Sequence, residues 1–192
     1  MRVDRRVFGL LFLGKEEEAR LKAFLNLELN IPEACLNKNY HITVYEARIE
    51  LPGLNPLQRS VSVQVPASMW RFMVMAPGGE NERPEINPDE RQIGLRLHRS
   101  ADAYSRVSEL RANFFRLEAA AGVPKRNRST LRLSAFGARN YQPHMTICQP
   151  GHGLGRNLSP HGEALRAGLG DLHFDRFEVR VFDTPSSDSL GR

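Results

Sequence analysis

Two histidines in this sequence are each followed two residues later by a threonine. His41 and Thr43 lie in one such segment, and His144 and Thr146 lie in the other. Both segments alternate apolar and polar residues, as half-buried strands do. Because residues i and i+2 of a strand point to the same face, each histidine shares a face with its threonine. A histidine titrates at a pKa of about 6.5, so one imidazole can act as general base and the other as general acid on a phosphodiester. The hydroxyls can donate to the phosphate oxygens.

The elements around the two motifs follow the same order, because a strand and a helix precede each motif strand. We expect these elements at 7–13, 16–29 and 40–47, and again at 93–98, 102–121 and 142–149. Further strands are expected at 60–65, 70–76 and 172–182, and a short helix at 159–168. A lone histidine in a strand is typically hydrogen-bonded to a neighbour, but two in matching positions of matching halves favour a catalytic pair.

The repeated order predicts an α+β fold of two pseudo-symmetric lobes, with the two motif strands facing each other across a cleft. We expect residues 1–183 to form one bilobed catalytic domain with interleaved lobes and residues 184–192 to form a flexible tail. The segment 77–90, rich in Pro, Gly, Asn and Glu, predicts an exposed loop between the halves.

These motifs resemble those of the 2H phosphoesterases, which include the LigT-like 2′-5′ RNA ligases and cyclic phosphodiesterases. The resemblance rests on H-I-T at 41–43 and H-M-T at 144–146, and on the Tyr-Gln-Pro context at 141–143. It implies two antiparallel sheets flanking a central groove, with helices outside. It also implies that the four motif residues cleave cyclic phosphates, 2′-5′ linkages or cyclic oligonucleotides without metal. The chain departs from many relatives at 148–150, where Cys-Gln-Pro replaces a basic residue, and in a longer gap between the motifs.

Four further residues are candidates for substrate binding. Tyr45 is expected on the face of the first motif, and Tyr141 lies just before the second, so either can stack on a base or pack in the core. Arg132 and Arg139 belong to the basic segment 125–139, which has no acidic residue. That segment either binds phosphates at the groove rim or forms a solvated hairpin.

Composition limits the class of protein. The chain has 192 residues, 41% of them hydrophobic, and a net charge of +5, which favour a globular protein with an anionic partner. Its two cysteines form no CxxC pattern, and no apolar run reaches the length of a membrane span. The run 7–13 reads as a core strand rather than a signal peptide, because acidic residues follow it at once. We expect a cytoplasmic protein with no membrane association and no obligate protein partner.

No metal or other cofactor is expected. His144, Cys148 and His152 have a suggestive spacing, but strand geometry places the first two about 13 Å apart, too far for one ion. The leading hypothesis is therefore a metal-independent phosphodiesterase acting on a nucleotide or an RNA end. The alternative is a non-catalytic module that binds nucleotide or RNA in the same groove.

Overall fold

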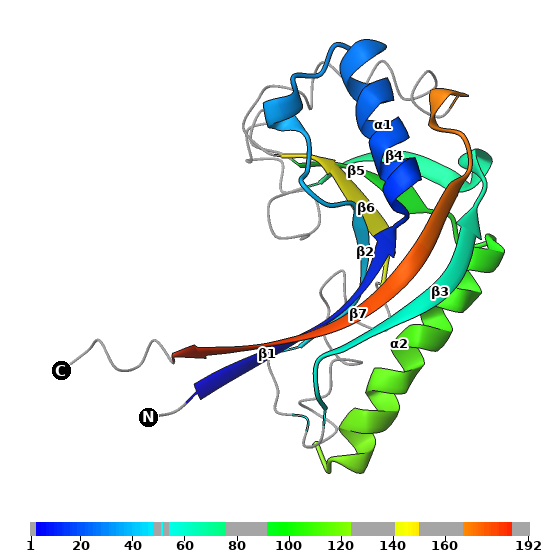
Figure 1. Cartoon of the computed structure of the whole chain (residues 1–192). Coiled ribbons are helices and arrows are strands. Elements are labelled where there is room, and N and C mark those ends of the chain that lie inside the picture. The colour runs from blue at the N-terminus through cyan, green and yellow to red at the C-terminus, as the bar shows by residue number, and fades with distance from the viewer. Residues whose placement is uncertain are drawn as a thin grey trace.

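The structure is a computed structural model that describes residues 3–47, 51, 54–75, 92–123, 141–149 and 167–185. It shows an α+β fold (Figure 1). The strands and long helices are β1 (Val3–Leu13), α1 (Lys15–Leu27), β2 (His41–Ala47), β3 (Leu57–Val65), β4 (Trp70–Met75), β5 (Gln92–Leu97), α2 (Asp102–Ala120), β6 (His144–Cys148) and β7 (Leu172–Pro185). Among these described helices, none combines the length and the apolar character that a membrane span needs.

The described strands form one antiparallel sheet of seven strands in the order β3-β7-β1-β2-β6-β5-β4. Figure 1 shows that this sheet is strongly curled. We expected two sheets with the motif strands facing each other across a cleft. The motif strands β2 and β6 are instead neighbours within the single sheet, so their polar side chains share a face rather than oppose each other.

The strand order has one feature in common on the two sides of the junction of the motif strands. On one side β2 is followed by β1, and on the other side β6 is followed by β5. In each half the motif strand thus pairs with the strand that begins that half in the sequence. Ile42 and Met145 pair across the junction, and both are fully buried. The pairing of the motif strand with the first strand is common to both halves, but four strands lie on the β2 side of the junction and three lie on the β6 side.

Helix α2 covers the apolar face of the sheet over β2 and β3. Its Phe114 packs against Tyr45 and Phe177, and it lies so close to β1 that a Cβ atom at Gly9 would be 2.7 Å from two ring carbons. Only glycine leaves room for this ring. In Figure 1, α2 runs along the outside of β3, and α1 lies at the other end of the molecule. The polar face opposite α2 is left for the motif side chains.

Most of the expected elements occur close to their predicted positions. The strand expected at 60–65 starts earlier, at Leu57, and β7 continues to Pro185, past the predicted domain end at 183. The loop expected at 77–90, the basic segment 125–139 and most of the helix expected at 159–168 lie outside the described residues.

We predict that Gly9→Ala destabilises the protein by about 1–3 kcal/mol, because the added methyl group overpacks the contact with Phe114. Urea unfolding of the variant measures this loss. In a Phe114→Leu background the same substitution should cost less, since the smaller side chain makes room. Equal costs in the two backgrounds would show that Gly9 does not need its close contact with the ring.

Candidate active site

The pairing of β2 with β6 brings the four motif residues together on one face of the sheet. Because Ile42 pairs with Met145 in an antiparallel register, the flanking positions place His41 beside Thr146 and Thr43 beside His144. All four side chains are partly exposed, whereas the alternate residues of both strands are buried. The four residues form a square in which the two histidines are diagonal neighbours. This geometry places their Cα atoms about 7–8 Å apart. One phosphate group can lie between them.

Two cross-strand rows extend from this square, one toward each edge of the sheet. The first row runs from His41 to Phe12 on β1 and then to Arg176 on β7. The second row runs from His144 to Arg96 on β5 and then to Arg71 on β4. Directly opposed residues of neighbouring strands share a face. The motif face therefore carries arginines on both sides of the histidines.

A β-bulge follows the threonine in each motif strand. On β2 the register with β1 shifts so that Leu10 pairs with Thr43 but Gly9 pairs with Tyr45. On β6 the register with β5 shifts in the same way, between Thr146 and Cys148. Each bulge inserts one extra residue and so reverses the face of the residues beyond it.

The bulges correct one sequence prediction. Tyr45 was expected on the face of His41 and Thr43, but it lies on the opposite face, opposite Gly9. It is only 1% exposed, stacks on Phe114 at 4.3 Å between ring centroids, and donates a 2.6 Å hydrogen bond to Glu118. Tyr45 therefore anchors α2 to the sheet and does not line the motif face.

Cys148 is turned inward in the same way. It is fully buried, and burial raises the pKa of its thiol to about 12. The thiol is thus a neutral core group rather than a ligand beside His144. Among the described residues, no three His, Cys, Asp or Glu side chains gather as a metal site would require.

Each threonine is held by a side chain from the other half of the chain. The hydroxyl of Tyr141 donates to the backbone carbonyl of Thr43 at 3.1 Å, and the Asn37 amide donates to the backbone carbonyl of Thr146 at 3.2 Å. Asn37 is oriented in turn by a 2.6 Å hydrogen bond from Gln149. These bonds fix the two motif strands relative to each other.

Tyr141 therefore has a structural role. Its ring is 3% exposed and lies 4.2 Å from the guanidinium carbon of Arg111 on α2. Burial raises the pKa of its hydroxyl, so the group stays protonated and keeps donating. Base stacking on this ring, one of the two predicted possibilities, is not favoured by such burial. Nothing in the spacing of the sequence pointed to the role of Asn37.

His144 is oriented by its own strand. Its Nδ1 lies 2.8 Å from the backbone carbonyl of Gln142, so the tautomer that donates this bond carries its proton on Nδ1. The other ring nitrogen, Nε2, is then the atom available to exchange a proton with a substrate. Burial lowers the pKa of His144, and the Gln142 carbonyl partly opposes that shift.

His41 has a similar setting. Burial lowers its pKa, the Asn39 backbone opposes this effect, and the charges of Arg180 and His144 lower the pKa further. Within the described part of the chain, the buried Nδ1 atom of His41 has no hydrogen-bond partner. The Asn39 backbone nevertheless favours the protonated ring. In the free protein both imidazoles therefore favour the neutral form near pH 7.

Two arginines of β7 lie over Phe12, the residue of β1 that pairs with His41. The guanidinium carbons of Arg176 and Arg180 are 4.7 and 4.9 Å from the ring centroid of Phe12, which lies 5.4 Å from the His41 ring. Both arginines also contact Glu178. Their alternation along 176–180 was visible in the sequence, but the pairing that brings them to His41 was not.

A cavity of about 470 Å³ lies beyond His144. Three arginines line it, Arg71, Arg96 and Arg99, and the described part of its lining contains no carboxylate. Arg96 also donates to Gln142 at 3.1 Å, two residues before His144. This end of the motif face therefore favours anions as well.

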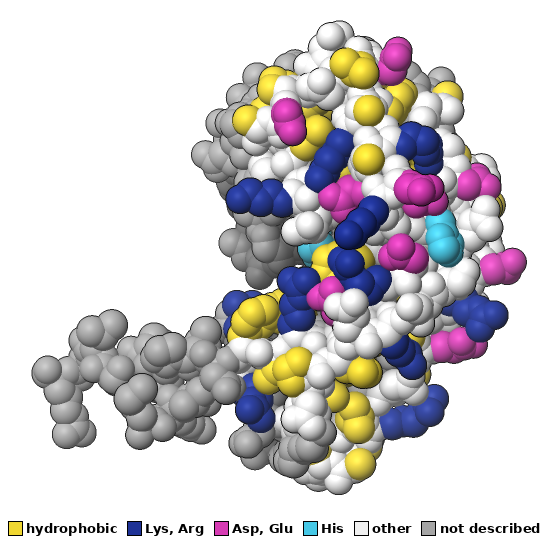
Figure 2. All heavy atoms as spheres, viewed as in Figure 1, with side chains coloured by type: hydrophobic (Ala, Val, Ile, Leu, Met, Phe, Trp, Pro, Cys, Tyr) yellow, Lys and Arg dark blue, Asp and Glu magenta, His cyan; other side chains and the backbone are white. Residues whose placement is uncertain are grey.

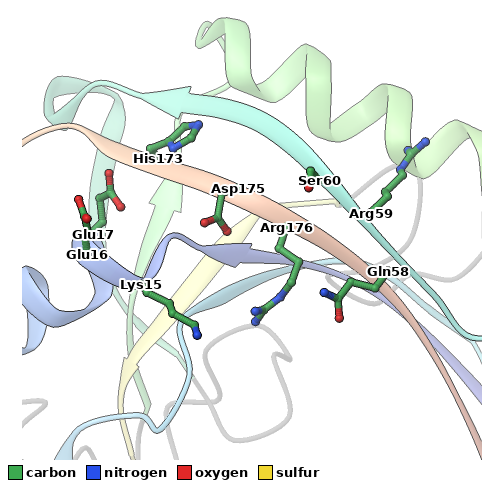
Figure 3. Close-up of a pocket in the computed structure, with 9 residues that line it drawn as sticks. All are labelled: Lys15, Glu16, Glu17, Gln58, Arg59, Ser60, His173, Asp175 and Arg176. Carbon is green, nitrogen blue, oxygen red and sulfur yellow. The ribbon is translucent and has the colours of Figure 1, made fainter.

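A second cavity, of about 550 Å³, lies near the start of α1 and contains none of the motif residues. Its lining combines both signs of charge, with Lys15, Arg59 and Arg176 beside Glu16, Glu17 and Asp175. Figure 3 shows Lys15, Gln58 and Arg176 extending to the same side of the sheet. Its mixed charges favour no single class of ligand.

Figure 2 shows a hollow in one side of the molecule, with a histidine at its inner end beside basic and hydrophobic side chains.

Arg132, Arg139 and His152 lie outside the described residues, so their predicted roles stay predictions. The chain matches no protein-family model and no curated protein. The function of the protein must therefore be inferred from the residues and the geometry of the site.

We predict that Tyr141→Phe lowers the free energy of unfolding by about 1–3 kcal/mol, because it leaves the Thr43 carbonyl without its donor. Urea unfolding measures the change. Tyr104→Phe on α2 is the matched control and should stay within about 0.5 kcal/mol of the wild type. A Tyr141→Phe protein as stable as this control would contradict the proposed clamp between the motif strands.

Proposed function

We propose that the protein is a metal-independent phosphodiesterase that cleaves a cyclic phosphate or an RNA-type or cyclic-oligonucleotide phosphodiester with His41 and His144. The observation that carries this proposal is the square of two histidines and two threonines on one partly exposed face. A pair of imidazoles with their Nε2 atoms directed away from the backbone can act on opposite sides of one phosphorus atom. The resemblance of the two motifs to those of the 2H phosphoesterases supports the same reaction.

The reaction needs one proton removed and one proton supplied. A neutral imidazole takes the proton from the attacking hydroxyl or water as that oxygen bonds to phosphorus. The other imidazole, protonated, gives its proton to the leaving oxygen as the P–O bond breaks. Each such transfer typically contributes about 10²–10⁴-fold to the rate. Thr43 and Thr146 donate to the non-bridging oxygens, where negative charge grows in the transition state.

The surroundings of the histidines favour one assignment of these roles. The nearby positive charge of Arg180 disfavours protonation of His41, so His41 is the better base. The hydrogen bond between Nδ1 of His144 and the Gln142 carbonyl stabilises the imidazolium, so His144 is the better acid. In the reverse direction of the same reaction, the two roles exchange.

We predict that His41→Ala and His144→Ala each lower kcat/KM by at least about 10²-fold, since each removes one proton transfer. The test uses 2′,3′-cyclic mononucleotides, 2′-5′ and 3′-5′ dinucleotides, and cyclic di- and trinucleotides in EDTA, with products separated by chromatography. His173→Ala is the matched control, because the His173 ring contacts Ser62 on β3 rather than the motif strands. It should retain full activity.

The outcomes of this test separate the hypotheses. Cleavage that survives EDTA and is lost in both motif variants supports the proposal. Tight nucleotide binding without turnover by the folded wild type would instead favour the non-catalytic module. Turnover that is undiminished in the motif variants would exclude the two-histidine mechanism.

We predict a bell-shaped pH dependence of kcat/KM with its optimum below pH 6.5. kcat/KM reports the free enzyme, in which burial lowers both histidine pKa values below about 6.5. As the pH rises through these values the acid loses its proton, and as it falls below them the base gains one, so activity drops on both sides. The optimum of kcat should lie at higher pH, because the bound phosphate anion raises both pKa values. An optimum of kcat/KM above pH 7 would contradict this account.

A further inference from the structure

The proposed reaction gives Arg180 an effect on the pKa of His41 only and gives Arg176 no role. Both belong to β7, which is separated from the motif strand β2 only by β1. Neighbouring strands lie about 4.8 Å apart, so β7 and β2 are separated by about 10 Å. Both guanidinium groups lie over Phe12 on β1, the residue that pairs with His41, and the charge of Arg180 acts on His41.

The Phe12 ring fixes the two arginines in place. The ring itself is only 3% exposed, and the two guanidinium groups lie over it. Arginine stacks well on aromatic faces, and such contacts hold the planar fork in a defined orientation. Because the ring is covered, it cannot stack on a nucleobase. What this cluster offers a ligand is positive charge and N–H donors.

Glu178 neutralises only part of this charge. It contacts Nε of Arg176 at 2.9 Å and accepts a hydrogen bond from Nε of Arg180 at 2.8 Å, with a terminal amino group of Arg180 at 2.6 Å. Among the side chains gathered at Phe12, two guanidinium groups and one carboxylate leave one net positive charge, while Arg176 also borders the mixed-charge cavity near the start of α1. The terminal amino groups of Arg176 have no hydrogen bond within the described part of the chain.

The arginines are accessible, whereas their counterion is not. The side chains of Arg176 and Arg180 are 33% and 44% exposed, but that of Glu178 is only 13% exposed. A ligand that approaches this face therefore meets donors before it meets the carboxylate. Arginine forks match the tetrahedral oxygens of a phosphate and often bind it through two parallel hydrogen bonds.

We propose that Arg176 and Arg180 bind a second phosphate of the substrate, which lies next to the scissile phosphodiester on the His41 side. The substrate class is then an oligonucleotide, linear or cyclic, rather than a nucleotide whose only phosphate is the one being cleaved. This inference rests on the proposed function, because it places the scissile phosphate between His41 and His144. It adds an anion subsite that the four motif residues do not supply.

The test uses substrate pairs that differ by one phosphate. The first pair is a nucleoside 2′,3′-cyclic phosphate with and without a 5′-phosphate. The second is a 2′-5′ dinucleotide with and without a terminal phosphate at either end. The wild type should prefer the phosphorylated member of at least one pair by about tenfold in kcat/KM, mainly through a lower KM. In the double variant Arg176→Gln/Arg180→Gln this preference should disappear, with both members of each pair compared in the same variant at its own pH optimum.

Two further variants control for charge and folding. Arg59→Gln also removes an arginine that rests on a phenylalanine, since Arg59 lies 5.3 Å from the Phe177 ring, but on the face that α2 covers. It should keep the tenfold preference. Arg176→Lys/Arg180→Lys keeps the charge without the fork and should keep part of the preference. Urea unfolding of all variants shows that each is folded.

Each outcome decides between the two proposals. A phosphate preference that persists in the double glutamine variant, or a wild type without any preference, would overturn the subsite and leave the two-histidine reaction intact. If the wild type cleaves none of the substrates, the proposed function fails. Calorimetric titration with the phosphorylated and unphosphorylated 2′-5′ dinucleotides then tests the subsite alone. Equal affinities for both would overturn it as well.

Discussion

The candidate site depends on the pairing of β2 with β6 through Ile42 and Met145. This pair is fully buried, and its register decides which residues lie beside each other on the opposite face. Because side chains alternate with a period of two, a slip by one residue would bury one histidine-threonine set and separate the histidines. The hydrogen bonds from Tyr141 and Asn37 to the two threonine carbonyls cross the same junction and oppose such a slip. The geometry of the motif site is thus specified by apolar burial and by the hydrogen bonds to the two threonine carbonyls.

The two β-bulges solve a packing conflict along the motif strands. Near their starts, at His41 and His144, the strands must present polar groups on the open face. A few residues further on they must bury Tyr45 and Cys148. A regular strand cannot do both, because Tyr45 and Cys148 lie four residues after the histidines and would point to the same face. One extra residue after each threonine turns the following side chains to the other face. Tyr45 can then anchor α2 through Phe114 and Glu118 while Thr43 remains on the open face.

Sequence patterns predicted the elements well, because alternation and helical spacing are local. They also predicted the matching order of the two halves, and in the sheet each motif strand pairs with the strand that begins its half. They did not predict that the halves form one sheet, since strand pairing depends on contacts distant in the sequence. The position of Tyr45 was wrong for a related reason: a bulge is a property of two paired strands. The adjacent apolar residues Val44 and Tyr45 break the alternation and were the one available signal. Arg176 and Arg180 were overlooked because only the register with β1 places them beside His41.

In the proposed reaction, burial and charge would couple proton transfer to substrate binding. In the free protein, burial favours the neutral imidazoles, and Arg180 adds to this effect at His41. A pair of neutral imidazoles contains a base but no acid. A phosphate anion bound between them would offset the nearby positive charge and raise the histidine pKa values, so that one imidazole takes up a proton and becomes the acid. The arginines on both sides of the histidines would attract such an anion. The same positive charges that favour neutral imidazoles in the free protein would therefore also favour binding of the anion that reverses their effect.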